Sequence, residues 1–321
     1  MLNVGMPEAV DPDLHRLLPP GISLELIPLQ PTQPIEVEFW IPPPWQGQAA
    51  RQLPWLRGLR VIQATLAGVD QLIKIKPAGV ILCDARGAHT VATAEWTLAA
   101  VLTSTKYFQL YSQVQQAGVW SRRKRAEELY HTLHPGAKRL YPPILCDQLS
   151  GQTVLIVGYG AIGHAIEQRL EPFGVNFVRI ARTARDGVHG VNRLRELLPS
   201  ADIVILIVPF TSETTGMIGA EELDLMKQGA LLVNAARGPV VDTDALIAAL
   251  HARRIIAAID VTDPEPLPDA HPLWHAPNLL ITPHVAGSTP MFMVRAIQFA
   301  AEQIGRYLRG EPLENVVEGE Y

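Results

Sequence analysis

The fold is decided by residues 153–163, which read Thr153-Val154-Leu155-Ile156-Val157-Gly158-Tyr159-Gly160-Ala161-Ile162-Gly163. Residues 153–157 are apolar and rich in β-branched side chains, which predicts a buried strand. Three glycines follow in the spacing G-x-G-x-x-G, and apolar residues then recur at helical spacing until Pro172-Phe173-Gly174 ends the helix. A strand, a glycine turn and a helix in this order are typical of a dinucleotide-binding unit.

Each glycine has its own task in such a unit. Gly158 permits the tight turn, Gly160 lets the backbone approach a pyrophosphate, and Gly163 lets the helix pack on the strand. The helix N-terminus then offers unpaired N–H groups and the positive end of a dipole to the phosphates. The same turn also occurs as a purely structural feature of α/β domains, so the turn alone leaves this alternative open.

Length and composition narrow the class of protein. A chain of 321 residues is long enough for two domains, and 48% hydrophobic with 18% charged residues predicts a large core. The formal net charge of −5 argues against binding of nucleic acid through phosphate contacts, and the run Arg122–Arg125 is interpreted as a solvated loop.

The cysteines and the lengths of the apolar runs indicate the cellular compartment of the protein. Cys83 and Cys146 have neither metal-ligand spacing nor a disulfide pattern, so we expect reduced thiols, no metal site and a cytoplasmic protein. The N-terminus does not resemble a signal peptide. No apolar run approaches the roughly 20 residues that span a bilayer, so no membrane partner is expected.

The segments on either side of the glycine turn differ in pattern. Before it, short strands such as 35–41, 60–64 and 80–83 predict a small parallel α/β domain. A long helix is expected from Val91 to about Val114, and an irregular segment over 121–150. Trp120 is interpreted as a buried packing residue.

After the glycine turn, strands and helices alternate. The pattern predicts a doubly wound parallel sheet followed by an amphipathic helix over 293–308. The expected strands are 175–181, 203–208, 230–234, 255–261 and 279–282, and the expected helices are 193–198, 221–227 and 244–252.

Polar residues that can carry out redox chemistry follow the later strands. Arg237, Asp260, Glu265 and His284 each come at or just after a strand end, where doubly wound sheets bind their ligands. A histidine can exchange the proton that accompanies hydride transfer, and a carboxylate beside it stabilises the charged imidazole. An arginine can hold a substrate carboxylate. Any one of these residues alone is more commonly structural.

Taken together and in this order, the motifs resemble those of the D-isomer-specific 2-hydroxyacid dehydrogenase family. The resemblance extends from Thr65 to Val317 and includes the glycine turn and segments 208–214, 234–238, 260–267 and 282–287. It implies a Rossmann nucleotide domain with a doubly wound parallel sheet, residues 94–288, and a smaller flavodoxin-like α/β substrate domain, residues 1–93 with 289–321. It also implies a homodimer paired through helices around the nucleotide domain.

The resemblance also implies roles for individual residues. His284 would be the acid/base and Glu265 its partner, Arg237 would bind and polarise the substrate, and Asp260 would contact the nicotinamide. The loop Leu66-Ala67-Gly68 resembles the loop that binds the substrate carboxylate. The implied cofactor contacts are Gly158, Tyr159, Gly160, Ala161, Ile162, Gly163, Arg182, Thr183, Arg185, Val208, Pro209, Thr214, Ala235, Ala236, Arg237, Asp260, His284 and Gly287.

Departures from the common pattern bear on the cofactor. NAD-binding units usually carry Asp or Glu about 20 residues past the glycines, for the ribose 2′-hydroxyl. No acid ends the second strand, which runs from Phe177 to Arg185, and Arg182, Thr183 and Arg185 can hold a 2′-phosphate instead. We therefore expect NADP(H) in preference to NAD(H).

The expected reaction is reduction of a small 2-oxo acid, such as glyoxylate or hydroxypyruvate, to the D-2-hydroxy acid. The alternative is a non-catalytic protein that senses nucleotides on the same scaffold. Formate oxidation is disfavoured, because Glu265 stands where formate dehydrogenases carry Gln.

Overall fold

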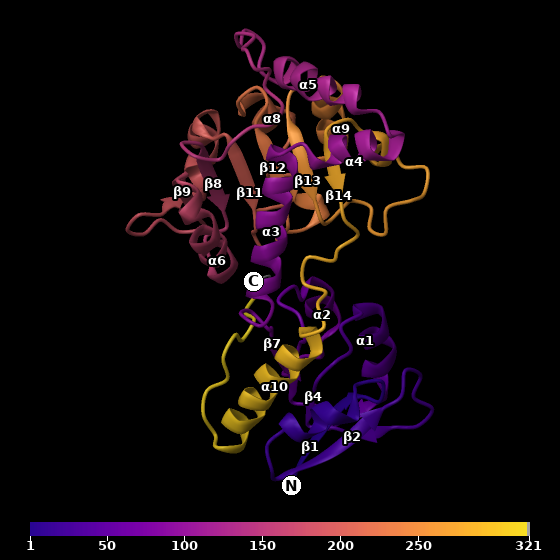
Figure 1. Cartoon of the computed structure of the whole chain (residues 1–321). Coiled ribbons are helices and arrows are strands. Elements are labelled where there is room, and N and C mark those ends of the chain that lie inside the picture. The colour runs from indigo at the N-terminus through magenta and orange to yellow at the C-terminus, as the bar shows by residue number, and fades with distance from the viewer. Residues whose placement is uncertain (320–321) are drawn as a thin grey trace. The chain divides into compact units, whose positions relative to one another are not determined.

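A computed structural model describes residues 1–319, except for the side chain of Gln46. The chain forms two compact units. The first consists of residues 1–90 with the described residues from 287 onward, and the second is continuous from 91 to 286. Both contain parallel sheets with helices on their faces, which confirms the predicted α/β class (Figure 1).

The second unit is built on a seven-stranded sheet in the order β10-β9-β8-β11-β12-β13-β14, with every neighbouring pair parallel. Counted from β8, this is the Rossmann order with one strand added. The strands are β8 (Thr153–Val157), β9 (Asn176–Ala181), β10 (His189–Gly190), β11 (Ile203–Leu206), β12 (Leu231–Asn234), β13 (Ile256–Ile259) and β14 (Leu279–Ile281).

Helices cover both faces of this sheet because its strands are apolar on both sides. Val154 and Ile156 of β8 pack with α3 (Thr90–Thr105) and α6 (Ala161–Leu170). Leu155 and Val157 point into the opposite core, which is closed by α7 (Leu194–Leu197), α8 (Ala220–Leu225) and α9 (Thr243–His251). Continuous apolar runs are what a parallel sheet buried on both faces requires.

The structure corrects two predictions for residues 91–150. The expected helix to Val114 is interrupted, because Tyr107 has a left-handed backbone (φ +55°) between α3 and α4 (Phe108–Ala117). The segment expected to be irregular contains α5 (Arg125–Leu133). That helix buries Ala126 and Leu133, and most of its other residues are polar or charged.

Trp120 was also predicted wrongly. Its side chain is 78% exposed in the short 3-10 helix Trp120–Lys124, which leads into α5. The basic run Arg122–Arg125 is exposed as expected, although it lies in this helical turn rather than in a loop. The remaining 3-10 helices are Pro12–Leu17, Leu53–Trp55, Glu171–Phe173, Val191–Arg193, Leu198–Ser200, Gly238–Val240 and Pro272–His275.

The first unit has a five-stranded parallel sheet in the order β2-β1-β4-β6-β7. Numbered along the chain, this is the 2-1-3-4-5 order of flavodoxin-like folds. Helices α1 and α2 close the core on one face, and α10 closes the other. The elements are β1 (Leu2–Pro7), β2 (Ile22–Ile27), β4 (Phe39–Trp40), β6 (Val61–Gln63), β7 (Ile81–Cys83), α1 (Gln46–Gln52), α2 (Asp70–Ile75) and α10 (Phe292–Leu308).

The single strand expected over 35–41 is two strands in two sheets. Residues 35–36 form β3 (Ile35–Glu36), which pairs with β5 (Leu56–Arg57). The N–H of Val37 still bonds to the carbonyl of Arg57, whereas the N–H of Glu38 bonds to the carbonyl of Asn3. The chain thus changes partner between these two residues, which apolar alternation alone does not reveal.

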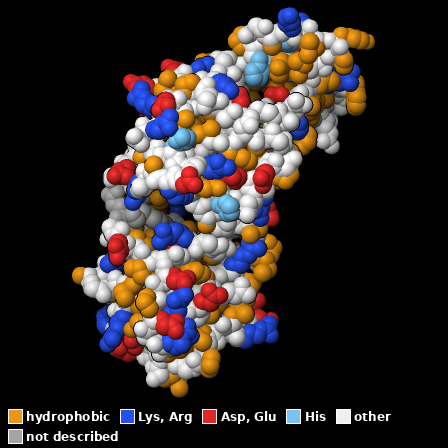
Figure 2. Space-filling model, turned by 90° about the vertical axis from the view of Figure 1, so that its left-hand side faces the viewer, with side chains coloured by type: hydrophobic (Ala, Val, Ile, Leu, Met, Phe, Trp, Pro, Cys, Tyr) orange, Lys and Arg blue, Asp and Glu red, His pale blue; other side chains and the backbone are white. Residues whose placement is uncertain are grey.

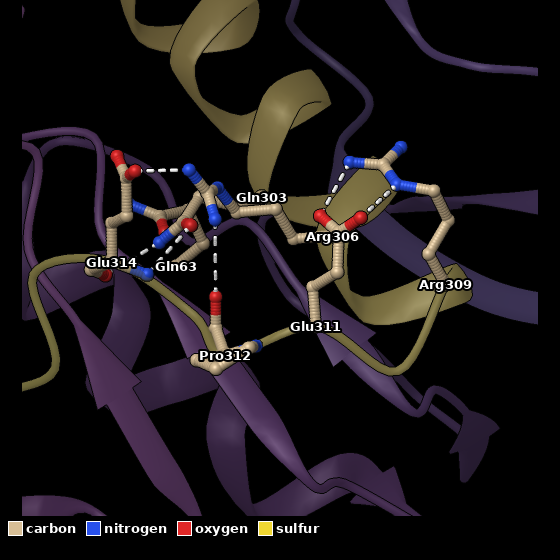
Figure 3. Close-up of polar contacts among 7 residues, drawn as sticks. All are labelled: Gln63, Gln303, Arg306, Arg309, Glu311, Pro312 and Glu314. Atoms are coloured by element: carbon tan, nitrogen blue, oxygen red, sulfur yellow. Dashed lines mark hydrogen bonds and ion pairs between the residues drawn. The ribbon is translucent and has the colours of Figure 1, made fainter.

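Within the first unit, the side chain of Gln303 on α10 links Gln63 of β6 to the C-terminal segment (Figure 3). This amide is 1% exposed; it donates to the Gln63 side chain (3.1 Å) and to the Glu314 carbonyl (2.6 Å), and it accepts from the Glu314 N–H (3.0 Å). Arg309 forms a bidentate pair with Glu311 at 2.8 Å. Residues 314–317 then lie along β7, where the Val317 N–H bonds to the Leu82 carbonyl.

The surface mixes both signs of charge. On the face drawn in Figure 2, Lys and Arg side chains are interspersed with Asp and Glu side chains. Among residues 1–319, no helix is long and apolar enough to cross a membrane.

The geometry of the glycine turn predicts the effect of Gly158→Ala. Gly158 has φ +105°, and a Cβ there would lie 2.5 Å from the Ile207 carbonyl oxygen. We expect the variant to lose about 3 kcal/mol of unfolding free energy, measured by urea denaturation. Gly160→Ala is the matched control, because a Cβ at Gly160 would meet no atom within 4 Å. Equal urea midpoints for Gly158→Ala and the wild type would contradict this explanation.

Candidate active site

The glycine turn forms one end of the candidate site, at the carboxyl edge of the sheet of the second unit. The N–H groups of Gly158 and Tyr159 both bond to the carbonyl of Ile180 on β9, at 2.9 and 2.8 Å. A Cβ on Gly163 would lie 2.9 Å from the Gly158 carbonyl oxygen, so α6 approaches the turn as closely as glycine allows. Gly160 and Ala161 are exposed where α6 begins. Open space in front of a helix N-terminus fits a dinucleotide pyrophosphate.

The three residues expected at a 2′-phosphate follow β9 and are exposed: Arg182, Thr183 and Arg185. Arg185 donates to the Tyr159 carbonyl at 2.5 Å, and its guanidinium lies 5.9 Å from the centre of the Tyr159 ring. The first acid after the strand, Asp186, lies in the tight turn between Arg185 and Val188.

An unforeseen acid approaches the same strand end. Glu213, from the loop after β11, lies 3.7 Å from the Arg182 guanidinium, with both side chains largely exposed. In this loop Val208 is half-buried and Pro209 is exposed. Thr214 is buried and closes the loop, since its hydroxyl donates to the Pro209 carbonyl and accepts from the Thr211 N–H, both at 2.8 Å.

The loop that carries Arg237 is supported by Asn234, the last residue of β12. Its buried amide accepts from the Ala236 N–H and donates to the Arg237 carbonyl, both at 3.0 Å. Ala235 and Arg237 are half-buried, and Ala236 is buried. A Cβ on Gly238 would lie 2.0 Å from the Thr262 carbonyl oxygen, so this loop is pressed against the loop after β13.

His284 and Glu265 form a close pair in the second unit. The His284 Nδ1 and the Glu265 Oε1 are 2.5 Å apart, and both side chains are about half exposed. Burial alone would raise the pKa of the Glu265 carboxyl, but the hydrogen bond from His284 and the positive charges of His284 and Arg237 outweigh it and hold this pKa below its ordinary value. The carboxylate is therefore ionised at neutral pH and accepts the hydrogen bond of the His284 ring.

The backbone of His284 is in an uncommon conformation. Its φ is +53°, in the left-handed region that costs a non-glycine residue about 1 kcal/mol or more. Its N–H bonds to the main-chain carbonyl of Asp260 at 2.7 Å. Asp260 itself is 2% exposed at the end of β13, so the residue expected beside the nicotinamide is deeply buried.

The remaining predicted residues belong to the first unit. Leu66, Ala67 and Gly68 are half-buried in the loop between β6 and α2, at the carboxyl edge of that sheet. Gly287 begins the second chain segment of this unit. Each unit thus carries part of the predicted set, with His284, Glu265, Arg237 and the glycine turn together in the second unit.

Comparison with known proteins establishes the family. The model of the D-isomer specific 2-hydroxyacid dehydrogenase, NAD binding domain, matches residues 98–286, more than half of the chain. The chain belongs to the D-isomer specific 2-hydroxyacid dehydrogenase family. It is thus an enzyme of the NAD(P)-dependent dehydrogenase class, and the predicted family is confirmed.

Individual members of this family are similar along most of the chain. A glyoxylate reductase of Thermofilum pendens is 35% identical over 263 residues, which are 79% of this chain and 73% of the relative. A D-3-phosphoglycerate dehydrogenase of Methanocaldococcus jannaschii is 34% identical over 272 residues, 81% of this chain. These residues are 47% of that relative, so the present chain spans about half of its length.

A solved structure shares the two-unit fold. The crystal structure of a D-isomer specific 2-hydroxyacid dehydrogenase from Xanthobacter autotrophicus, in complex with NADPH and MES, has a TM-score of 0.78 and 29% identity. The similarity covers 99% of this chain and 100% of that one.

The sequence alone does not reveal two side-chain hydrogen bonds near the predicted site residues, one made by His89 and one made by Trp96. His89 bonds through Nε2 to the Thr65 carbonyl at 2.8 Å, directly before the loop 66–68, and its ring stacks on Phe292 at 4.3 Å. The indole of Trp96 donates to the Thr282 hydroxyl at 3.0 Å. Thr282 lies two residues before His284, but 186 positions separate it from Trp96.

The open space at Gly160 predicts a specific loss of cofactor. Gly160→Ala leaves the protein's own packing intact, because the new methyl group meets no protein atom within 4 Å. The methyl group would occupy the space of a bound pyrophosphate, so we expect the Kd of NADPH to rise roughly tenfold or more, about 1.4 kcal/mol. Fluorescence titration measures this Kd, and thermal unfolding checks that stability is unchanged. An unaltered Kd would show that the turn does not hold the cofactor.

Proposed function

We propose that the protein reduces a small 2-oxo acid to the D-2-hydroxy acid with NADPH. The pair between His284 and Glu265, at 2.5 Å, is the observation that carries this proposal. An imidazole that is hydrogen-bonded to a carboxylate next to a dinucleotide-binding sheet edge is suited to proton transfer coupled to hydride transfer. The glyoxylate reductase among the relatives supports glyoxylate as a substrate, and hydroxypyruvate is the second small 2-oxo acid that we propose.

When bound, the reduced nicotinamide supplies the hydride that C2 of the 2-oxo acid receives. The electron pair of the carbonyl π bond then moves to oxygen, and His284 neutralises this oxygen by donating the proton of Nε2. Because Nδ1 faces Glu265, Nε2 is the nitrogen available for this transfer. Arg237 binds the substrate carboxylate and stabilises the developing charge.

His284→Ala tests the proposed proton donor. We expect kcat for hydroxypyruvate reduction to fall about 100- to 10,000-fold, the usual contribution of a general acid. The Kd of NADPH should stay within about twofold, because the imidazole acts on the substrate. His275→Ala, an exposed histidine of the 3-10 helix 272–275, is the control.

Two results would count against this mechanism. Unchanged turnover in His284→Ala would remove the imidazole from it. A wild-type protein that binds NADPH but reduces no 2-oxo acid would favour the nucleotide-sensing alternative.

The preference for NADPH rests on the residues after β9. Arg182, Thr183 and Arg185 offer charge and hydrogen-bond donors at the strand end. Arg185 is already oriented through the Tyr159 carbonyl. A charge-assisted bond to a 2′-phosphate is worth about 1.5–3 kcal/mol, which corresponds to a preference of one to two orders of magnitude.

Arg182→Ala tests this preference. We expect KM for NADPH to rise about tenfold while KM for NADH stays within about twofold. Arg195→Ala is the control, because Arg195 is an equally exposed arginine that is paired with Glu221. Initial rates with both cofactors decide the matter, and a higher kcat/KM of the wild type with NADH would refute the proposal.

We also propose that the protein acts as a cytoplasmic homodimer. Large apolar side chains are exposed in the segment 108–141 of the second unit, which is unusual for a surface that stays in water. These residues are Phe108, Val119, Trp120, Leu140 and Tyr141, exposed between 40% and 99%. Cys83 and Cys146 are both free thiols, as is usual in a reducing compartment.

A further inference from the structure

The carboxylate of Asp260 organises the segment 282–286 that carries His284. Its Oδ1 accepts from the Thr282 hydroxyl (2.6 Å) and the Val285 N–H (2.8 Å), and its Oδ2 accepts from the Ala286 N–H (2.8 Å). With the bond from the His284 N–H to the Asp260 carbonyl, four donors of this segment converge on one residue.

The bond from Thr282 has a fixed direction, and Trp96 fixes it. An indole N–H can only donate, and a hydroxyl carries a single hydrogen. The Thr282 hydroxyl lies between them, 3.0 Å from the Trp96 nitrogen and 2.6 Å from Asp260 Oδ1. It must therefore accept from Trp96 and give its single hydrogen to Asp260. The chain of bonds runs in one sense from α3 to the carboxylate.

These bonds hold the backbone of His284 and thereby orient its imidazole. His284 has a left-handed backbone that ordinary residues avoid, so neighbouring bonds must hold it. The bonds from residues 284, 285 and 286 to Asp260 do so, and they leave Nδ1 at 2.5 Å from Glu265. If Oδ1 loses the Thr282 donor, the carboxylate can rotate away from the Val285 N–H, and the segment loses its anchor.

We propose that Trp96 and Thr282 are positioning residues that aim His284 through the Asp260 carboxylate. This proposal rests on the proposed function, in which His284 donates the proton. Neither residue needs to contact substrate or cofactor. The expected consequence of losing either one is a slower chemical step with little change in binding, because a proton donor displaced by about 1 Å loses much of its efficiency.

The test compares Thr282→Val, Thr282→Ser and Trp96→Phe in the full chain with NADPH and hydroxypyruvate. Valine matches threonine in shape but cannot donate a hydrogen bond, so kcat of Thr282→Val should fall about 10- to 100-fold. The kcat of Trp96→Phe should lie between the values of the wild type and Thr282→Val. KM for hydroxypyruvate and the Kd of NADPH should change less than about threefold, and Thr282→Ser should keep at least about half of kcat.

Thr97→Val is the matched control. Thr97 is a neighbour of Trp96 on α3, is fully buried, and gives its hydroxyl hydrogen only to the Thr93 carbonyl at 2.8 Å. The variant loses one buried hydrogen bond without touching the segment 282–286, so its kcat should stay within about twofold. If kcat fell equally in Thr97→Val and Thr282→Val, general destabilisation would explain both results, and the proposal would be overturned.

A crystal structure of Thr282→Val separates this proposal from the proposed function. We expect a rotated Asp260 carboxylate and a separation of His284 from Glu265 beyond the 2.5 Å of the wild type. Unchanged positions of both side chains would overturn the positioning role, whatever the turnover. If the wild type reduces no 2-oxo acid, the proposed function fails, and the structural comparison still decides whether Trp96 and Thr282 position His284.

Discussion

The buried carboxylate of Asp260 is the contact on which the candidate site depends. A carboxylate that is 2% exposed loses most of its hydration, which costs several kcal/mol unless donors replace the lost water. Here a hydroxyl and two main-chain N–H groups replace it. The same bonds order the segment 282–286. One set of contacts thus compensates both the burial of the carboxylate and the left-handed backbone of His284.

The strand order brings the other parts of the site to the same edge. In a parallel sheet, all loops after the strands leave from one side, so the glycine turn, the Arg237 loop and the segment with His284 share it. The residues that we propose for phosphate and ribose binding follow β8 and β9, whereas those that we propose for the chemical step follow β12, β13 and β14. Dinucleotide binding and chemistry are thus assigned to neighbouring strands, and each can be altered by separate substitutions.

Local patterns were sufficient to predict most of the second unit. The glycine spacing and the continuous apolar runs mark strands β8 and β11–β13, because burial on both faces demands such runs. The polar residues after those runs include Arg237 and Glu265, and His284 follows β14. The break at Tyr107 and the exposure of Trp120 depend on packing between distant segments, which periodicity does not report. The change of partner at residues 37–38 has the same cause.

Contacts between side chains that lie far apart in the sequence could not be predicted either. Thr282 stands beside a recognised motif, yet its partner Trp96 lies 186 positions away. Glu213 reaches Arg182 from a different loop, although the strand end itself lacks an acid. Such contacts follow from the sheet topology, which places the ends of distant segments together. The residue types that do chemistry are therefore easier to predict than the residues that orient them.

We propose that the His284–Glu265 pair serves hydride transfer to C2 of a 2-oxo acid. The most direct measurement follows deuterium from NADPH labelled with two deuterons at C4 of the nicotinamide into hydroxypyruvate, with the product analysed by mass spectrometry and chiral chromatography. We expect D-glycerate that carries one deuterium at C2. Glycerate without the label, or the L-isomer, would contradict it.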